Sequence, residues 1–227
     1  MAPSAQPTAE LSHLPKADGS ATYSYCGFTV TAAVNGPVEA PRRDENAFEA
    51  LVDVIVRPAA GPGGTAERQL ESILQPALRQ LIPIRNFPRC MIQIALQVME
   101  MPENSYAITK LLQAQLAIAT ATTLAVGVEG SDDDIVVDPG MAEADKAQSM
   151  HVLGFTSDDE LLMVESAGSF TAEEWGKILQ TGQRICCQDH DSGLDTAMSG
   201  DGLQSQSIRA FVRSVIRTKT SADLYWK

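Results

Sequence analysis

The sequence has 227 residues, of which 44% are hydrophobic and 20% charged, as is typical of a globular protein. Its 17 basic and 29 acidic residues give a net charge of −12 at pH 7, the reverse of what a protein needs to bind nucleic-acid phosphates unaided. No apolar run reaches the roughly 20 residues of a membrane-spanning helix, so we predict no membrane association.

The first part of the chain predicts a leader followed by two strands. Residues 1–16 are rich in alanine, proline and serine without an apolar core or basic flank, so we expect a disordered leader and no secretory signal. Residues 28–34 and 51–57 alternate apolar side chains with polar or small ones, the period of a half-buried strand. Gly36 and Pro37 predict a turn that ends the first strand.

A loop, a helix and a further strand are predicted next. Residues 58–64 are rich in proline and glycine and predict the loop. Thr65 can cap the helix, whose apolar residues recur at three- and four-residue intervals over residues 70–81. Pro76 removes a backbone hydrogen bond within this segment, so we expect a kink or an early break. Residues 90–98 alternate strictly and predict a strand.

The second half of the sequence predicts more strands and helices. In chain order these are a helix at 108–116, strands at 120–128, 135–137, 150–155 and 161–165, a helix after Thr171 and a last helix from Ile208. Thr171 and Glu174 have the spacing of a capping box. Residues 189–207, rich in glycine, serine and aspartate, predict a flexible insertion. Because strands and helices do not alternate regularly, we predict an α+β (mixed α/β) fold.

Cysteine and histidine are too few and too scattered to indicate a metal centre. The four cysteines include no C-x-x-C pair, and Cys186 and Cys187 are adjacent. The three aspartates at 132–134 lack the spacing and the glycine of a Ca²⁺ loop, so we interpret them as a solvated charge cluster. We therefore predict neither a metal nor a cofactor.

An ordered series of short motifs resembles the RNase PH family. Residues 18–21, 26–30, 34–39 and 42–45 resemble the family's G-S-A, G-x-T-x-V and G-P-x-E elements and the basic pair that follows them. The Gly-Gly-Thr loop at 63–65 and the Asp-Ile-Val-Val-Asp stretch at 134–138 continue the series. The resemblance covers about residues 17–188, and within the family the ring subunits of the eukaryotic RNA exosome are the most similar.

The resemblance implies an RNase PH fold, a single domain over residues 17–227, and a place in a six-membered ring of paired subunits. The implied partners are other RNase PH-like ring subunits, a cap of S1/KH proteins, and RNA that passes through the channel. The implied function is that of a non-catalytic structural subunit that supports 3′→5′ processing and degradation of rRNA, mRNA and noncoding RNA. The implied localisation is the nucleus, including the nucleolus, and the cytoplasm.

The residues that give active family members their chemistry are altered in this sequence. Active members bind phosphate with a G-T-R-T turn at a helix N-terminus, whereas the corresponding residues 101–109 include no arginine or glycine. Asp138 matches the first of two catalytic aspartates, but Ala144 stands at the second position, and Asp145 would lie on the opposite face of a strand. Gly64 replaces a basic residue of bacterial relatives. We therefore predict an inactive protein in which Asp138 and Asp145 are vestiges.

Four arginines are candidates for RNA contact. Arg42 and Arg43 match the family's basic pair near the RNA path, and a solvated turn explains them equally well. Arg85 and Arg89 flank a predicted loop, and we interpret them as surface residues, with an RNA contact as the alternative.

Three further arginines are candidates for docking a partner. Arg209, Arg213 and Arg217 are four residues apart and form a basic stripe on the last helix. The stripe is either the solvent-facing side of a packed helix or a docking surface for an acidic partner or RNA.

Two other functions compete with the ring subunit. One is an active phosphate-dependent 3′→5′ exoribonuclease that works as a homo-oligomer. It requires Asp138 and Asp145 to converge, with Lys110, Arg85 or Arg89 as the missing cation. The other is an adaptor outside the exosome that binds through its basic C-terminal helix.

Overall fold

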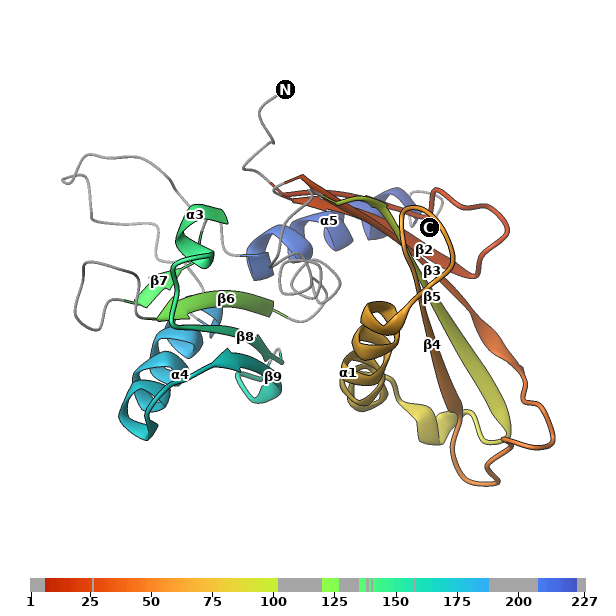
Figure 1. Ribbon diagram of the computed structural model, residues 1–227. Helices are drawn as coiled ribbons and strands as arrows, with labels where there is room; N and C mark the ends of the chain where they lie inside the picture. Colours follow the sequence, from red (N-terminus) through yellow and green to blue (C-terminus); the bar gives the residue numbers. More distant parts are fainter. Residues whose placement is uncertain are drawn as a thin grey trace. The chain divides into compact units, whose positions relative to one another are not determined.

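The computed structural model describes residues 7–25, 27–101, 120–126, 135–137, 139, 141–156, 158–187 and 208–223. The chain divides into two compact units, Met1–Gln115 and Leu116–Lys227, and each contains one sheet (Figure 1). The assignment of residues 17–227 to a single domain stays a prediction. The predicted α+β class is confirmed, because each unit combines a sheet with helices in an order that does not alternate.

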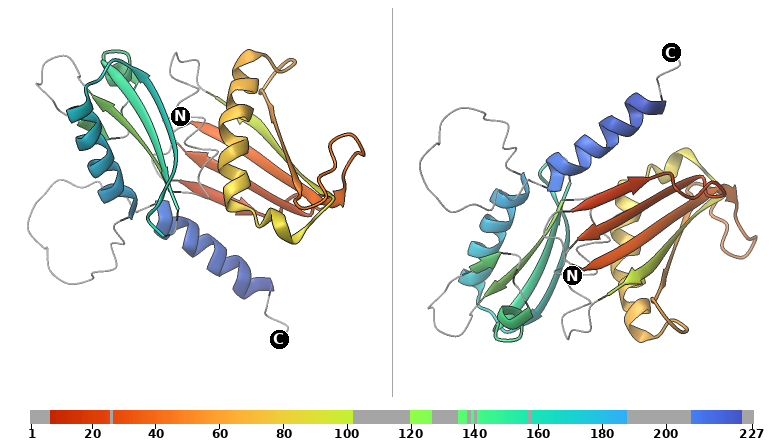
Figure 2. Two further views of the ribbon diagram at one scale, coloured as in Figure 1. Left: turned by 90° about the horizontal axis from the view of Figure 1, so that it is seen from below. Right: turned by 90° about the horizontal axis from the view of Figure 1, so that it is seen from above.

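The first unit is a five-stranded sheet with a helix on one face (Figure 2). In spatial order its strands are β1 (Thr8–Leu11), β2 (Gly19–Tyr25), β3 (Phe28–Glu39), β5 (Cys90–Glu100) and β4 (Leu51–Arg57). Strands β4 and β5 are parallel, because the helix α1 (Thr65–Leu81) crosses between them, and the other neighbours are antiparallel.

Buried and more exposed side chains alternate along β4 and β5, and the buried ones form the core of this unit on the helix side of the sheet. The side chains buried there include Val52, Val54 and Val56 of β4, Ile92, Ile94, Leu96 and Val98 of β5, and Leu70, Leu74 and Ala77 of α1. The register pairs Val52 with Ile92, Val54 with Ile94 and Val56 with Leu96, so both strands turn the same face to the helix. The strands predicted at 51–57 and 90–98 are confirmed. The predicted helical stripe is confirmed at Leu70, Leu74 and Ala77, whereas its last member, Leu81, is exposed.

Helix α1 also protects the exposed edge of the sheet. The Val56 backbone N–H donates to Glu71 Oε1 (2.8 Å), and Gln75 Nε2 donates to the Val52 carbonyl (3.0 Å). These side chains satisfy backbone groups of β4 that have no neighbouring strand, which is how proteins block pairing at a sheet edge. The early break predicted at Pro76 is wrong, since the helix continues to Leu81 while its buried face packs on the sheet.

Three further local predictions are corrected. The helix is capped by Gly64 rather than Thr65, because the Gly64 N–H reaches the carboxylate of Glu67. Part of the predicted leader is ordered, since strand β1 pairs with β2 along its whole length.

The turn predicted at Gly36 and Pro37 is also wrong, because β3 continues to Glu39 with a register shift between Asn35 and Val38. Gly36 has φ +138°, and a Cβ there would lie 2.8 Å from the Met91 carbonyl oxygen, so the position requires glycine. Its N–H donates to Asp18 Oδ2 (2.8 Å), which joins the Asp-Gly-Ser motif to the Gly-Pro motif.

The second unit is a four-stranded antiparallel sheet with a helix on one face. Its spatial order is β7 (Ile135–Val137), β6 (Thr120–Val126), β8 (Ser149–Phe155) and β9 (Leu161–Gly168). Helix α4 (Ala172–Cys187) packs on this sheet, and α3 (Met141–Ala144) and α5 (Ile208–Asp223) complete the unit (Figure 1).

The core of this unit joins α4 to the central strand. Leu153 and Phe155 of β8 are buried against Ile178 and Cys186 of α4. The capping box is confirmed, because Thr171 N–H donates to Glu174 Oε2 (2.5 Å) and Glu174 N–H donates to Thr171 Oγ1 (3.3 Å). The helix predicted at 108–116, residues 127 and 128 of the predicted strand, and the insertion at 189–207 lie outside the described residues.

Candidate functional site

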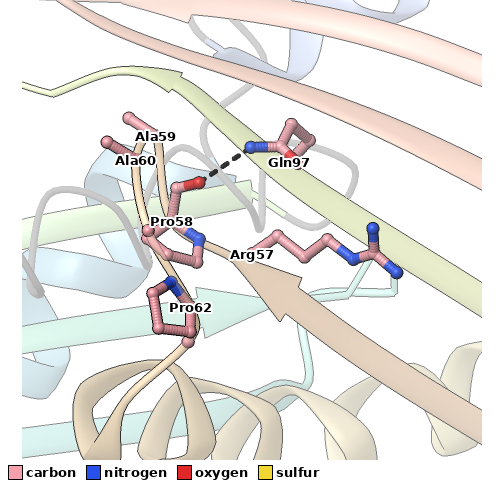
Figure 3. Close-up of a pocket in the computed structure, with 8 residues that line it drawn as sticks. Arg57, Pro58, Ala59, Ala60, Pro62 and Gln97 are labelled. Atoms are coloured by element: carbon pink, nitrogen blue, oxygen red, sulfur yellow. Dashed lines mark hydrogen bonds between the residues drawn. The ribbon is translucent and has the colours of Figure 1, made fainter.

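The loop after β4 forms a hollow on the surface of the first unit. Its cavity of about 450 Å³ is lined by residues 57–63 and by Gln97 of the adjacent strand β5. Gln97 Nε2 donates a hydrogen bond to the Pro58 carbonyl oxygen (2.8 Å), which holds the loop to the sheet (Figure 3). The same nitrogen lies 3.0 Å from the carbonyl oxygen of Val98, its neighbour in β5. The hollow therefore lies where the parallel strands end and α1 begins, a position at which α/β units often bind ligands.

The groups that line this hollow do not suit phosphorolysis. Arg57 is the one charged side chain among them, and none of them is a carboxylate or a histidine. At the adjacent helix N-terminus, the Gly64 N–H donates to Glu67 Oε2 (2.6 Å). The chain's own carboxylate thus occupies a donor that would otherwise face an anion and places a negative charge there. The hollow can hold an anionic group through Arg57, but its lining supplies no acid or base.

The structure describes one of the two predicted vestigial aspartates. Asp138 lies outside the described residues, and Asp145 is exposed in the turn that follows α3. Our expectation that Asp145 lies on a strand is wrong, because the short helix α3 separates it from β7. Of the residues predicted to replace the phosphate-binding turn, 102–109 lie outside the described residues, as does Lys110.

The four RNA-contact candidates lie together at the other end of the first sheet. Arg42 and Arg43 are exposed in the loop that joins β3 to β4, and Arg85 is exposed in η1 (Ile84–Asn86). Arg89 has φ +61° and pairs with Glu45 of the same loop (3.4 Å). This end of the sheet is separated from the hollow by the length of β4, which is about 20 Å from Leu51 to Arg57.

An exposed aromatic residue in the same loop was not among the predicted site residues. Phe48 is 81% exposed, and its backbone N–H donates to Asn46 Oδ1 (3.0 Å). The signal was present in the sequence, since Phe48 is the aromatic residue of a polar segment between two strands. A large apolar side chain presented to solvent beside arginines is the kind of group that binds a partner.

All three docking candidates lie on the C-terminal helix α5, and the structure describes the side chains of two of them. Arg213 and Arg217 are exposed, whereas the side chain of Arg209 lies outside the described part of the structure. Ile216 is 51% exposed, and Lys219 pairs with Asp223 (3.1 Å) in the last turn. The helix thus presents both basic and apolar groups, and docking through it stays a prediction.

The second unit contains a fully buried histidine. His151 is 0% exposed, with Nδ1 2.9 Å from Ser166 Oγ and Nε2 2.9 Å from Ser149 Oγ. The rings of Phe170 and Trp175 pack around it. Burial lowers the pKa of His151 below its ordinary value, and the nearby charge of Glu174 opposes this shift. Since both ring nitrogens are bonded within the core, His151 organises the packing of this unit and does not face a substrate.

Neither a metal centre nor a membrane span is found among the described residues. In that part of the chain, no three histidine, cysteine, aspartate or glutamate side chains are grouped so that they could hold a metal ion. Its helices are also too short or too polar to cross a bilayer.

Comparison with known proteins identifies relatives of both halves of the chain. The family model of the 3′ exoribonuclease family, domain 1 (RNase PH), matches residues 6–128. The exosome complex component RRP46 of Saccharomyces cerevisiae is 27% identical over 198 residues, which cover 78% of this chain and 89% of the yeast protein. The exosome complex component rrp46 of Schizosaccharomyces pombe is 25% identical over 178 residues, which cover 74% of this chain and 79% of that protein.

A solved structure has the same fold. The crystal structure of rice (Oryza sativa) Rrp46 superposes with a TM-score of 0.67 at 23% sequence identity. The superposition covers 77% of this chain and 86% of the rice chain. The fold expected from the motif series is therefore confirmed.

Proposed function

The chain belongs to the 3′ exoribonuclease (RNase PH) family, and we propose that it is a non-catalytic structural subunit of the core ring of an RNA exosome. The observation that carries the proposal is the similarity to the yeast RRP46 exosome component, which extends over 89% of that protein. A ring subunit of this kind supports 3′→5′ processing and degradation of rRNA, mRNA and noncoding RNA by forming part of the RNA channel.

The structure and the sequence both support a non-catalytic role. The hollow at the end of β4 has one cation and no acid or base in its lining, and Glu67 occupies the adjacent helix N-terminus. Residues 101–109 include neither arginine nor glycine, so the sequence lacks the pattern with which active family members hold phosphate. Phosphorolysis needs a held phosphate and a group that moves a proton.

The partners in this proposal are other RNase PH-like ring subunits, S1/KH cap proteins, and RNA in the assembled channel. A net charge of −12 suits such an assembly, because basic neighbours complement an acidic subunit across their interfaces. The exposed Arg213 and Arg217 on α5 are docking candidates for one of these partners. Assembly with such partners would place the protein in the nucleus, including the nucleolus, and in the cytoplasm.

The test is purification of the tagged native protein, mass spectrometry of what it retains, and an RNA decay assay with and without phosphate. We expect a stoichiometric assembly of several RNase PH-like subunits and no phosphate-dependent decay by this chain alone. A homo-oligomer that releases nucleoside diphosphates only in the presence of phosphate would refute the proposal and support an active exoribonuclease. A chain that retains no ring partner would refute it as well.

A further inference from the structure

Strand β9 (Leu161–Gly168) forms one edge of the second sheet (Figure 1). Strand β8 pairs with it on one side, and no described strand lies on the other side. We propose that this edge binds an extended, basic segment of a partner protein, which joins the sheet as a further strand. Such a site goes beyond the proposed function, because strand addition requires neither the RNA channel nor the ring.

Half of the backbone groups of β9 face the open edge. The Ser169 N–H donates to the Gln148 carbonyl (3.4 Å), which makes these two residues a hydrogen-bonded pair of the ladder. Hydrogen-bonded and non-hydrogen-bonded pairs alternate along antiparallel strands, so the register places the N–H and C=O groups of Val164 and Ser166 at the open edge. The distance of 2.9 Å between Ser166 Oγ and His151 Nδ1 agrees, because side chains lie nearest to each other in non-hydrogen-bonded pairs.

The edge at β9 lacks the protection that the other described edges have. Strand β4 is covered by the side chains of Glu71 and Gln75, and β1 and β7 have only four and three residues. Strand β9 has eight residues, and none of them is lysine, arginine or proline, which commonly block pairing at an edge. No described residue forms a hydrogen bond with its edge-facing backbone groups. A long edge of this kind is a template for another strand.

The charges around β9 select a basic partner. Residues 147–176, which contain β8 and β9, include neither lysine nor arginine. Their carboxylates are those of Asp158, Asp159, Glu160, Glu165, Glu173 and Glu174. The first three are exposed in the hairpin turn beside Leu161, which is itself 45% exposed, and Glu165 forms no ion pair with any described residue. A strand that alternates basic and apolar residues therefore complements both the charge and the apolar groups of this edge.

Two other occupants fit this edge less well. A second copy of the chain would bring the carboxylates of two identical hairpins together, and like charges oppose such pairing. RNA offers no ladder of N–H and C=O groups, and the carboxylates would repel its phosphates. An extended protein segment gains affinity from the ladder itself and specificity from its alternate side chains.

The test measures, by fluorescence anisotropy, the affinity of the full-length chain for a labelled eight-residue peptide, the length of β9, in which lysine and valine alternate. Val164→Pro removes one edge-facing N–H and leaves the ladder with β8, since proline is tolerated at such positions of an edge strand. It should weaken binding about 5- to 150-fold, because one carbonyl of the peptide loses its hydrogen bond. Val164→Ala is the matched control, since it loses the same packing against the core, keeps the N–H and should retain the affinity.

A second peptide, with proline in place of each valine, has the same charge but cannot form the ladder. It should bind the wild type at least about 5-fold more weakly, a result that does not depend on how Val164→Pro folds. Glu165→Gln should weaken binding of the lysine–valine peptide by up to about 5-fold and reduce its salt dependence.

Equal affinities for the two peptides would mean that charge alone holds them and would overturn the proposal. No binding by the wild type, or equal affinities of Val164→Pro and Val164→Ala, would also overturn it. A wild-type dimer in sedimentation that Val164→Pro dissociates would overturn the choice of partner and make the edge a contact between two copies. Failure of the proposed ring function is measured separately, by the partners that the tagged wild-type chain retains, and does not involve the peptides.

Discussion

Gly168→Ala tests the packing at the end of β9. Gly168 pairs with Ser149 across the antiparallel strands β8 and β9 and has φ +101°. A Cβ at this position would contact the Gln148 carbonyl oxygen and lie 2.7 Å from Ser149 Cα. Both are backbone atoms, so no side-chain rotation relieves the overlap. Moving Ser149 would also disturb its 2.9 Å hydrogen bond to the buried His151.

The expected loss of stability in Gly168→Ala is the sum of a backbone cost and a packing cost. A residue other than glycine at this φ costs about 1–3 kcal/mol, and overpacking against atoms that cannot rotate away costs about 1–3 kcal/mol more. Together they predict a loss of about 2–6 kcal/mol in the free energy of unfolding of the second unit. For a chain of this size, 1 kcal/mol shifts the melting temperature by about 2–4 °C, so we expect a decrease of at least about 4 °C.

The assay is thermal and urea unfolding followed by the fluorescence of Trp175, which packs against Phe170 and His151. A Trp226→Phe background removes the second tryptophan of the chain. Gly176→Ala in α4 is the matched control, because nothing lies within 4 Å of its Cβ. It should be neutral or stabilise by up to about 1 kcal/mol. Equal melting temperatures for Gly168→Ala and Gly176→Ala would refute the reasoning.

Two further predictions concern the cores of the two units. Because burial lowers the pKa of His151 in the folded state, the unfolded chain takes up its proton first, and the free energy of unfolding should decrease as the pH falls below about 6.5. Urea titrations at a series of pH values test this, and the same slope in His151→Gln would contradict it. Leu74→Ala should cost about 2–5 kcal/mol, because Leu74 is 0% exposed under the sheet. The control is Leu81→Ala on the same helix, which should cost under about 1 kcal/mol because Leu81 is 38% exposed. Chemical denaturation measures both variants. Equal losses of stability in Leu74→Ala and Leu81→Ala would contradict the packing described for α1.

The elements with strong local periodicity were predictable from the sequence. A spacing of two residues predicted strands β4 and β5. Spacings of three and four residues predicted the buried stripe of α1, and the three-residue spacing of Thr171 and Glu174 predicted the capping box of α4. The motif series also predicted the fold. The candidate arginines were predicted as separate pairs, but their shared position at one end of the first sheet was not.

The predictions of local structure that were wrong lie where contacts between residues distant in sequence override the preferences of the local sequence. Strand β1 lies in a segment whose composition indicates disorder, and it is ordered by pairing with β2. Gly36 and Pro37 indicate a turn, but pairing with β5 keeps β3 extended beyond them. Pro76 interrupts one backbone hydrogen bond, and the packing of Leu74 and Ala77 on the sheet holds the helix together on both sides of it.

The sequence by itself therefore determined which faces of the strands and helices are apolar, because that pattern depends on neighbours only a few residues away. The tertiary structure alone decided which side chains those faces cover. It buried His151 between Ser149 and Ser166, and it left Phe48 in solvent. Burial depends on residues that are remote in sequence, and the backbone carbonyls of Ile84 and Arg89, which hold the loop between β3 and β4 at Ala50 and Ala40, lie some 40 residues from it.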